Sequence, residues 1–345
     1  MTRVVFVVID ALPVDLVGPT HTPNLARLAD EGGTNPRGGR AVLSTATYPN
    51  HATFVTGLAP VGHGILVNRV WNGTEFRPAS EIGPRGDTIF AAARRAGRSS
   101  AIAVGDHHLI GVMGGLEADR HWPPDGRRPE VELDEFRYAT NAAVLDAIDE
   151  VDLVEADLAV VHFNEPDTVS HRFGPHSAEL AECAQRTDAA LGELLERLQP
   201  GWDDTVVMVV SDHDQEQVSA HGIDLEAELA ANGLPGSVET EGTAALVMHG
   251  PPVERLRQLD CVEGAHIIDD ANTIVWGAPG VVFGLWLDEL HGSHGSPRCD
   301  RQVAVIGGGA SAVAPLAEAL RAARPDATWW APTIIELLGS ASAPR

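Results

Sequence analysis

Short, continuously apolar runs alternate with longer amphipathic segments along most of the chain, and this alternation restricts the fold more than any other feature. "RVVFVVID" comes before "NLARLADEG", "SSAIAVG" comes after "TIFAAARRAG", and "ADLAVVHF" comes before "SAELAECAQRTDAALGELLERL". "TVVMVVSD" follows, and "QVAVIGGG" then comes before "AVAPLAEALRAA". Strands that are apolar on both faces need cover on both faces. The sequence therefore predicts an α/β fold with a mostly parallel central sheet and helices on both faces.

The stretch from about residue 240 to residue 290 interrupts this pattern with shorter apolar runs. It contains "TAALVMHG", "PVERLRQL", "GAHIIDD" and "GVVFGLW". We expect a small α/β insertion there, within a single domain that spans residues 1–345.

Charge and composition exclude several classes of protein. The formal net charge is −25, and all 24 cationic side chains are arginines, because the sequence contains no lysine. Such a surface repels nucleic-acid polymers and anionic membranes. No apolar run approaches the roughly 20 residues of a membrane span, and "VVFVVID" is too short for a signal peptide, so we expect a cytoplasmic protein. Cys183, Cys261 and Cys299 are widely spaced, which indicates reduced thiols rather than a disulfide framework.

Three of the expected strands run into an aspartate. Asp10 ends "VVFVVID", Asp212 ends "TVVMVVSD", and Asp167 lies just past "ADLAVVHF". A single aspartate at this place is commonly a helix cap or a turn residue. In open α/β sheets, however, ligands bind at the carboxyl ends of the strands, so the three carboxylates could meet in one crevice.

Histidines accompany two of these aspartates at spacings that suit a metal site. In "DTVSH", His171 lies four residues after Asp167, and in "SDHD", His213 follows Asp212 directly. "HGSHGSP" adds His291 and His294 in a glycine-rich loop. Mixed histidine and carboxylate ligands suit zinc or manganese better than calcium. The spacing favours a metal site over a set of unrelated caps.

The stretch "STATYPNHATFVTG" supplies candidate nucleophiles for such a site. It contains Thr45, Thr47, Thr53 and Thr56. A hydroxyl group bonded to a divalent cation loses its proton near neutral pH, because the cation lowers the pKa of the hydroxyl as it does that of a bound water. Two cations can also stabilise the attacking and leaving oxygens of a phosphoryl displacement.

Four blocks of sequence resemble the nucleotide pyrophosphatase/phosphodiesterase family of the alkaline phosphatase superfamily. "TATYPNHATFVTGLAPVGHGILVN" is similar to the nucleophile region of that family. "NEPDTVSHRFGPHSAELAECAQRTDAALGELLERL", "SDHD" and "HGSP" are similar to its metal-binding segments and occur in the same order. The resemblance implies an alkaline phosphatase-like fold. It also implies hydrolysis of a phosphodiester or pyrophosphate bond in a small, nucleotide-like substrate, with two zinc ions, or Mn²⁺ or another divalent transition metal, as cofactors.

The resemblance also implies a role for each site residue. Thr47, directly before "YPNH", matches the threonine that forms a phospho-threonine intermediate. The metal that activates Thr47 would be bound by Thr47 itself, Asp10, Asp212 and His213, and the metal at the leaving oxygen by Asp167, His171 and His294. Asn68 would donate a hydrogen bond to a phosphoryl oxygen, assisted by the Tyr48 backbone N–H. The Tyr48 ring would pack on the leaving group, or alternatively serve as a core aromatic.

Other residues near these motifs have simpler explanations. Thr53 and Thr56 fall inside the expected helix, where a threonine commonly bonds a carbonyl one turn back. His51 and His63 could support the metal ligands from behind, but local structural hydrogen bonds are the expectation. His291 is a rival to His294, and Asp106, His107 and His108 in "GDHHLIG" could line a substrate pocket. "VIGGGAS" lacks the lysine of a phosphate-binding loop and is expected to be a strand-to-helix turn.

Departures from the family pattern bear on the substrate. Asp214 stands where the family motif usually has glycine. Relatives that act on phosphonates or phosphate monoesters bind the additional negative charge of the substrate with lysines, and this chain has no lysine. That absence favours a diester or pyrophosphate, although arginine could substitute. A phosphomonoesterase or phosphonate hydrolase with the same two-metal site is the alternative reaction, and a non-catalytic, metal-stabilised binding protein is the alternative class.

Overall fold

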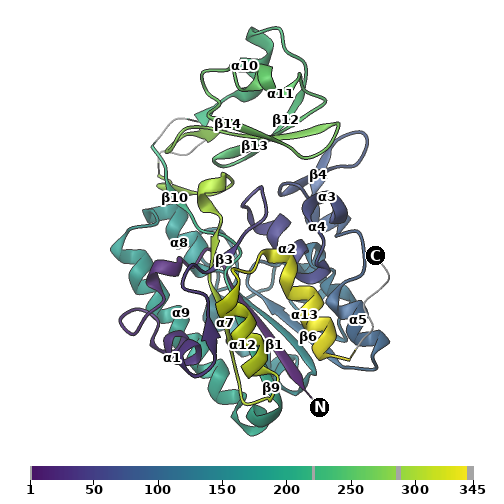
Figure 1. Ribbon diagram of the computed structural model, residues 1–345, viewed down its shortest axis with the longest axis vertical. Coiled ribbons are helices and arrows are strands. Elements are labelled where there is room, and N and C mark those ends of the chain that lie inside the picture. The colour runs from purple at the N-terminus through teal and green to yellow at the C-terminus, as the bar shows by residue number, and fades with distance from the viewer. Residues whose placement is uncertain (1, 220–221, 285–288, 340–345) are drawn as a thin grey trace.

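The computed structural model describes residues 2–219, 222–284 and 289–339. A seven-stranded sheet crosses its larger part in the order β2-β19-β9-β1-β8-β6-β7 (Figure 1). The strands β9, β1, β8, β6 and β7 run parallel to one another, and β19 is antiparallel to both of its neighbours. In chain order the strands are β1 (Arg3–Ile9), β2 (Gly33–Thr34), β6 (Ser100–Val104), β7 (Arg120–Trp122), β8 (Leu158–Phe163), β9 (Thr205–Val210) and β19 (Ala304–Gly307).

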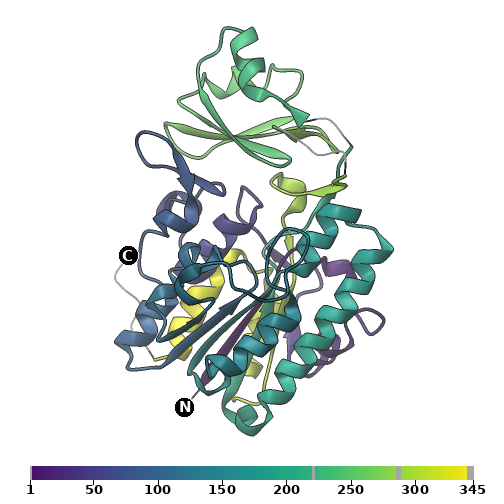
Figure 2. The same cartoon turned by 180° about the vertical axis from the view of Figure 1, so that it is seen from behind.

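The direction of β19 follows from the path of the chain. After β9 the chain leaves the sheet at its carboxyl edge and enters the smaller upper part of the molecule (Figures 1 and 2). It returns to that same edge, so the next strand must run back down the sheet. The mostly parallel α/β sheet predicted from the sequence is thus confirmed, with an antiparallel edge formed by "QVAVIGGG".

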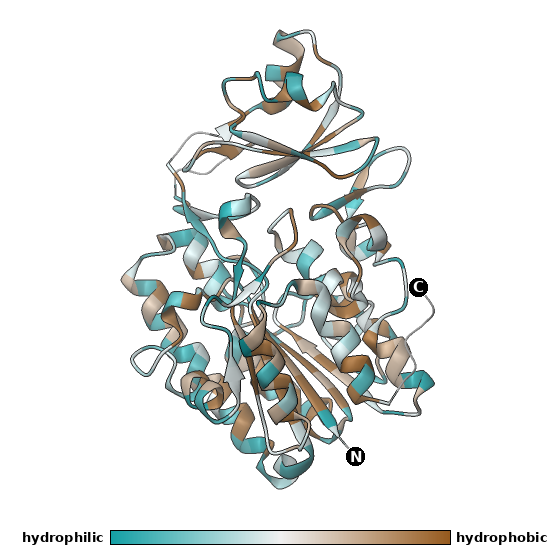
Figure 3. Cartoon of the chain, in the orientation of Figure 1, coloured by the Kyte–Doolittle hydropathy of each residue, from teal (hydrophilic) through white to brown (hydrophobic). Residues whose placement is uncertain are grey.

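Helices cover both faces of this sheet because its strands are buried on both sides. Val4, Phe6 and Val8 pack on the face under α2, α5 and α13, whereas Val5 and Val7 pack under α1, α7 and α9. Figure 3 shows the strands as the most hydrophobic part of the large domain. The helices around the sheet are α1 (Pro23–Glu31), α2 (Thr47–Thr56), α5 (Ile89–Arg95), α7 (Asn141–Glu150), α8 (Glu165–Phe173), α9 (Ala178–Arg197), α12 (Val313–Ala322) and α13 (Trp330–Leu337).

The smaller part holds a four-stranded antiparallel sheet, ordered β12-β13-β15-β14, with two short helices on one side (Figure 1). Its elements are α10 (Leu225–Ala231), β12 (Ser237–Glu241), β13 (Ala244–Met248), α11 (Val253–Leu256), β14 (Gly264–Ile267) and β15 (Asn272–Trp276). Leu225 and Leu229 of α10 share a core with Ala245 and Val275. This unit therefore includes residues before position 240, and residues 285–288 of the predicted range lie outside the described residues.

Short elements connect the two parts and shape the loops above the large sheet. They are β3 (Gly39–Arg40), α3 (Pro60–His63), β4 (Arg69–Trp71), β5 (Phe76–Pro78), α4 (Ala79–Ile82), α6 (Leu109–Val112), β10 (Glu216–Gln217), β11 (Gly222–Ile223), β16 (Val282–Phe283), β17 (Gly292–Ser293) and β18 (Arg301–Gln302). The three cysteines are free, as predicted. No helix in the described ranges is both long and apolar enough to cross a bilayer.

Candidate active site

Thr47 is the first residue of α2, where the helix meets the carboxyl edge of the large sheet. Ala46 before it is extended (φ −123°, ψ 161°), so the chain turns sharply into the helix. Thr45 anchors this turn, since its hydroxyl donates to the Ser296 carbonyl at 2.7 Å and therefore points away from Thr47. The first N–H groups of a helix lack partners within it and favour an anion. The predicted nucleophile thus lies at a place suited to a phosphoryl group.

A first cluster of ligand-type side chains, Asp10, Asp212 and His213, meets the Thr47 hydroxyl through His213. The Thr47 Oγ1 atom lies 3.2 Å from His213 Nε2. His213 Nε2 is in turn 3.1 Å from Asp212 Oδ2 and 3.8 Å from Asp10 Oδ1. These two carboxylate oxygens are buried and have no hydrogen-bond donor among the described residues. A pair of buried, unpaired carboxylate oxygens beside an imidazole and a hydroxyl fits a cation.

A second cluster adjoins the first through His213. The ligand atoms of Asp167, His213 and His294 all lie within 4.8 Å of one another. His171 Nε2 is 3.4 Å from Asp167 Oδ1, and the rings of His171 and His294 are 5.0 Å apart. His171 Nδ1 lies 2.8 Å from the Gly292 carbonyl, which leaves Nε2 free as a ligand. All the predicted ligands are therefore brought together, although they are spread between positions 10 and 294.

The protonation states of these groups also suit a metal. Burial, and then the charges of Asp212 and Asp167, raise the pKa of Asp10 well above its usual value. Burial lowers the pKa of His213 to about 4. A neutral histidine is the form that binds metals, and buried carboxylates close together are costly unless a cation offsets their repulsion. The nitrogen and oxygen donors of both clusters suit zinc or a similar transition ion.

Asn68 and Tyr48 are connected differently from the sequence-based expectation. The Tyr48 backbone N–H donates to Asn68 Oδ1 at 3.1 Å, so it orients the carboxamide rather than facing a substrate directly. The Asn68 N–H donates to Glu241 Oε2 at 2.6 Å. The Tyr48 ring is 9% exposed and belongs to the core cluster under α2, and its hydroxyl donates to Asp106 Oδ2 at 3.0 Å. Packing of this ring on a leaving group stays a prediction.

The simpler explanations given to neighbouring residues are confirmed for most of them. The Thr53 and Thr56 hydroxyls donate to the carbonyls of Pro49 and Ala52, one turn back. His63 bonds Thr53 and the Ile65 N–H. His291 is exposed and lies outside these clusters, and "VIGGGAS" connects β19 to α12.

The variant loop at Asp214 and the histidines after β6 have their own contacts. Asp214 pairs with Arg301 at 2.8 Å, which glycine could not do. His107 and His108 lie beside Asp106, whose pKa burial raises to about 6. His108 is also near the Tyr48 ring, with 6.4 Å between ring centroids.

Sequence reasoning missed three side chains that contact the predicted site. His162 Nε2 lies 2.9 Å from Asp10 Oδ2, and Gln215 Nε2 donates to Asp167 Oδ1 at 2.6 Å. Glu241 reaches Asn68 from the smaller part of the molecule. His162 alone carried a signal, since it is a histidine inside the otherwise apolar strand "LAVVHF".

The comparisons with known proteins agree with this geometry. Residues 4–275 match the family model for type I phosphodiesterase/nucleotide pyrophosphatase. The chain belongs to this family. Among relatives, the venom phosphodiesterase of Macrovipera lebetinus is 30% identical over 213 residues, which are 59% of this chain and 24% of the relative. An uncharacterized pyrophosphatase/phosphodiesterase of Schizosaccharomyces pombe is 30% identical over 235 residues, or 63% of this chain and 46% of the relative. The chain spans about a quarter to a half of the length of these curated relatives.

Solved structures of ectonucleotide pyrophosphatase/phosphodiesterase 5 share the fold. Murine ectonucleotide pyrophosphatase/phosphodiesterase 5 superposes with a TM-score of 0.74 at 17% identity, covering 100% of this chain and 97% of that chain. An inactive threonine-to-alanine form of the same protein, in complex with AMP, gives a TM-score of 0.73 at 16% identity and the same coverage. At these identities the likeness shows the fold, and it confirms the predicted alkaline phosphatase-like class.

Proposed function

We propose that this chain hydrolyses a phosphodiester or pyrophosphate bond in a small, nucleotide-like substrate through a phospho-threonine intermediate on Thr47. The observation that carries the proposal is the position of Thr47. Its hydroxyl lies at a helix N-terminus, 3.2 Å from His213, beside two clusters of Asp and His side chains. Family membership and the AMP complex of the inactive murine neighbour, a threonine-to-alanine form, support the reaction and the substrate class.

The residues divide the work as follows. One zinc ion, or Mn²⁺ in its place, would be held by Asp10, Asp212, His213 and Thr47 and would lower the pKa of the Thr47 hydroxyl. A second ion would be held by Asp167, His171 and His294 and would stabilise the leaving oxygen. Thr47 Oγ1 attacks phosphorus, the bond from phosphorus to the leaving oxygen breaks, and water then hydrolyses the phospho-threonine. Asn68 donates its Nδ2–H to a phosphoryl oxygen, because Tyr48 holds Oδ1 on the other side.

Replacement of Thr47 tests the nucleophile. Thr47→Ala should lower turnover of bis(p-nitrophenyl) phosphate by a factor on the order of 10³ or more, because it removes the hydroxyl on which the proposed covalent intermediate forms. The matched control is Thr56→Ala at the other end of the same helix, where the hydroxyl donates to the Ala52 carbonyl and accepts from the Leu58 N–H. Zinc content and melting temperature should stay near wild type in both variants. Turnover by a folded, metal-loaded Thr47→Ala variant would refute the assignment.

The choice of substrate separates the remaining possibilities. We expect the bis-ester and a dinucleotide to be cleaved faster than p-nitrophenyl phosphate, since the chain has no lysine to neutralise the second charge of a monoester. Faster cleavage of the monoester would favour the phosphomonoesterase alternative. A metal-loaded wild-type protein that cleaves none of these esters would favour the binding-protein alternative. A cytoplasmic location also stays a prediction.

A further inference from the structure

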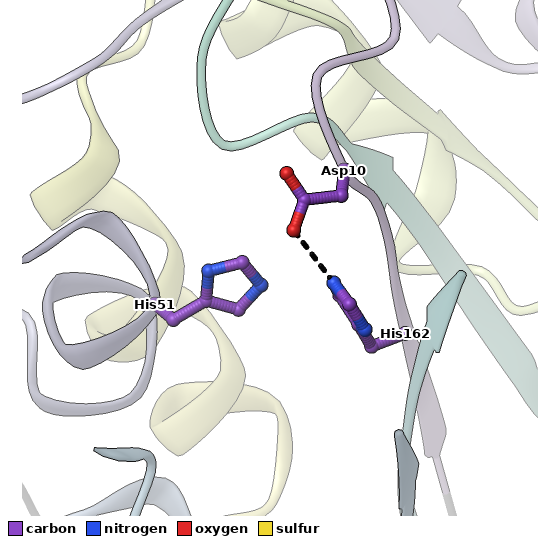
Figure 4. A group of neighbouring side chains, drawn as sticks. All are labelled: Asp10, His51 and His162. Atoms are coloured by element: carbon purple, nitrogen blue, oxygen red, sulfur yellow. Dashed lines mark hydrogen bonds and ion pairs between the residues drawn. The ribbon is translucent and has the colours of Figure 1, made fainter. Parts of the chain in front are cut away.

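Three fully buried side chains, those of Asp10, His51 and His162, converge beside the first cluster, where His51 Nδ1 lies 3.6 Å from Asp212 Oδ2. Asp10 comes from the end of β1, His51 from the second turn of α2, and His162 from β8 (Figure 4). None of the three is more than 1% exposed. Asp10 Oδ2 and His162 Nε2 are 2.9 Å apart, and one ligand atom from each of the three residues lies within 4.8 Å of the others.

His51 is held in the tautomer of a metal ligand. Its Nδ1–H donates to the Thr47 carbonyl at 2.8 Å, so Nε2 carries a lone pair. Nε2 is buried and has no partner among the described residues. His171 and His213 follow the same pattern, with Nδ1 on the carbonyls of Gly292 and Asp214. A metal-binding histidine commonly donates its second ring N–H to a carbonyl, which fixes the tautomer and the ring orientation.

The orientation of the Asp10 carboxylate also suits a further cation. Asp10 directs Oδ1 towards His213 and Oδ2 towards His162, so its two oxygens can serve two different ions. Two imidazole nitrogens and one carboxylate oxygen form a common set of three ligands for catalytic zinc, with distances of about 2.0–2.2 Å.

We propose a third divalent transition-metal site formed by Asp10 Oδ2, His51 Nε2 and His162 Nε2, beside the two clusters of the proposed reaction. Zinc is the expected ion. Its binding moves the His162 proton to Nδ1 and replaces one hydrogen bond with three coordinate bonds. Because His51 also bonds the Thr47 carbonyl, the ion ties the first turns of α2 to the ends of β1 and β8. It therefore positions Thr47 without contacting a substrate.

Zinc counting tests the site on the full chain. The protein is saturated with zinc and desalted, and zinc per chain is measured by mass spectrometry. His162→Phe should lose one ion relative to wild type. His176→Phe, the same change at an exposed histidine, should lose none. Equal zinc counts in wild type and His162→Phe would overturn the proposal. A loss of two ions would overturn it as well, since His162 would then only hold Asp10 in place for the other clusters.

Two further measurements keep the result decisive. If His162→Phe does not fold by circular dichroism, His162→Gln takes its place. Anomalous diffraction at the zinc edge should place a peak between Asp10, His51 and His162, and a map without that peak would overturn the site. The outcome is separable from the proposed reaction, because the ions left in His162→Phe report on the other two clusters. His294→Ala, which leaves the third site intact, should lose an ion from those clusters alone.

Discussion

Asn68 offers the sharpest test of how the site stabilises charge. Tyr48 N–H holds Asn68 Oδ1 at 3.1 Å, and Glu241 holds the Asn68 N–H at 2.6 Å, so the Nδ2 group is the part of the side chain left for a phosphoryl oxygen. Loss of one preorganised donor costs about 10²–10³ in kcat, or roughly 2.7–4 kcal/mol. Asn68→Ala should show a loss of this size. Asn68→Asp keeps the acceptor for Tyr48 but puts an anionic oxygen in place of the donor, so it should lose at least as much.

Steady-state kinetics with bis(p-nitrophenyl) phosphate measure this effect, together with zinc content and melting temperature. The loss should fall on kcat more than on KM, since the developing charge belongs to the transition state. Asn72→Asp, in the exposed β4–β5 turn where Asn72 Oδ1 accepts the Thr74 N–H, is the control and should keep wild-type activity. An Asn68→Asp enzyme that is more active than Asn68→Ala would refute the reasoning, as would activity within threefold of wild type for both.

Two further predictions concern stability. Burial raises the pKa of Glu241 to about 8 from 4.5, so between these pH values the folded chain binds more protons than the unfolded one, and its stability falls as pH rises. Glu241→Gln should remove this dependence on pH, which changes the free energy of unfolding by at most about 5 kcal/mol. Urea unfolding at several pH values measures it. The same dependence in wild type and Glu241→Gln would contradict a raised pKa at Glu241. Phe54 is fully buried with its ring 5.6 Å from that of Phe6, and Phe54→Ala should cost about 3–5 kcal/mol. Phe54→Leu serves as the control, and a loss below about 1 kcal/mol for Phe54→Ala would show that the core under α2 rearranges.

The contacts of Glu241 explain why the smaller part of the molecule matters to the site. Glu241 ends β12 and reaches the Asn68 backbone, while Thr243 in the following turn donates both its N–H and its hydroxyl to the His294 carbonyl, at 2.8 and 3.0 Å. The turn between β12 and β13 thus contacts the segments that carry a predicted phosphoryl donor and a predicted metal ligand. Sequence reasoning treated this region only as an insertion, because Glu241 and Thr243 lie in no recognisable motif.

The sequence by itself determined the features that depend on neighbours along the chain. Apolar runs such as "TVVMVVSD" identified the buried strands, and the aspartates at their ends were assigned to one edge because parallel strands end there. Local motifs singled out Thr47 before "YPNH", and His171 four residues after Asp167. Local patterning also accounted for the bonds that the Thr53 and Thr56 hydroxyls donate to carbonyls one helical turn back.

Only the tertiary structure decided which distant groups meet. The pairing of His162 with Asp10 depends on β1 and β8 being adjacent in register, with Val8 opposite His162, and these residues are separated by more than 150 positions. The reversed direction of β19 depends on where the chain returns from the smaller part. The bond from Tyr48 to Asn68 depends on the path of the loop between them. Periodicity and motifs describe a residue's own segment. Burial, buried polar atoms without a partner and shared ligands depend instead on contacts between segments. Those contacts make Asp10 a candidate ligand of two metal sites.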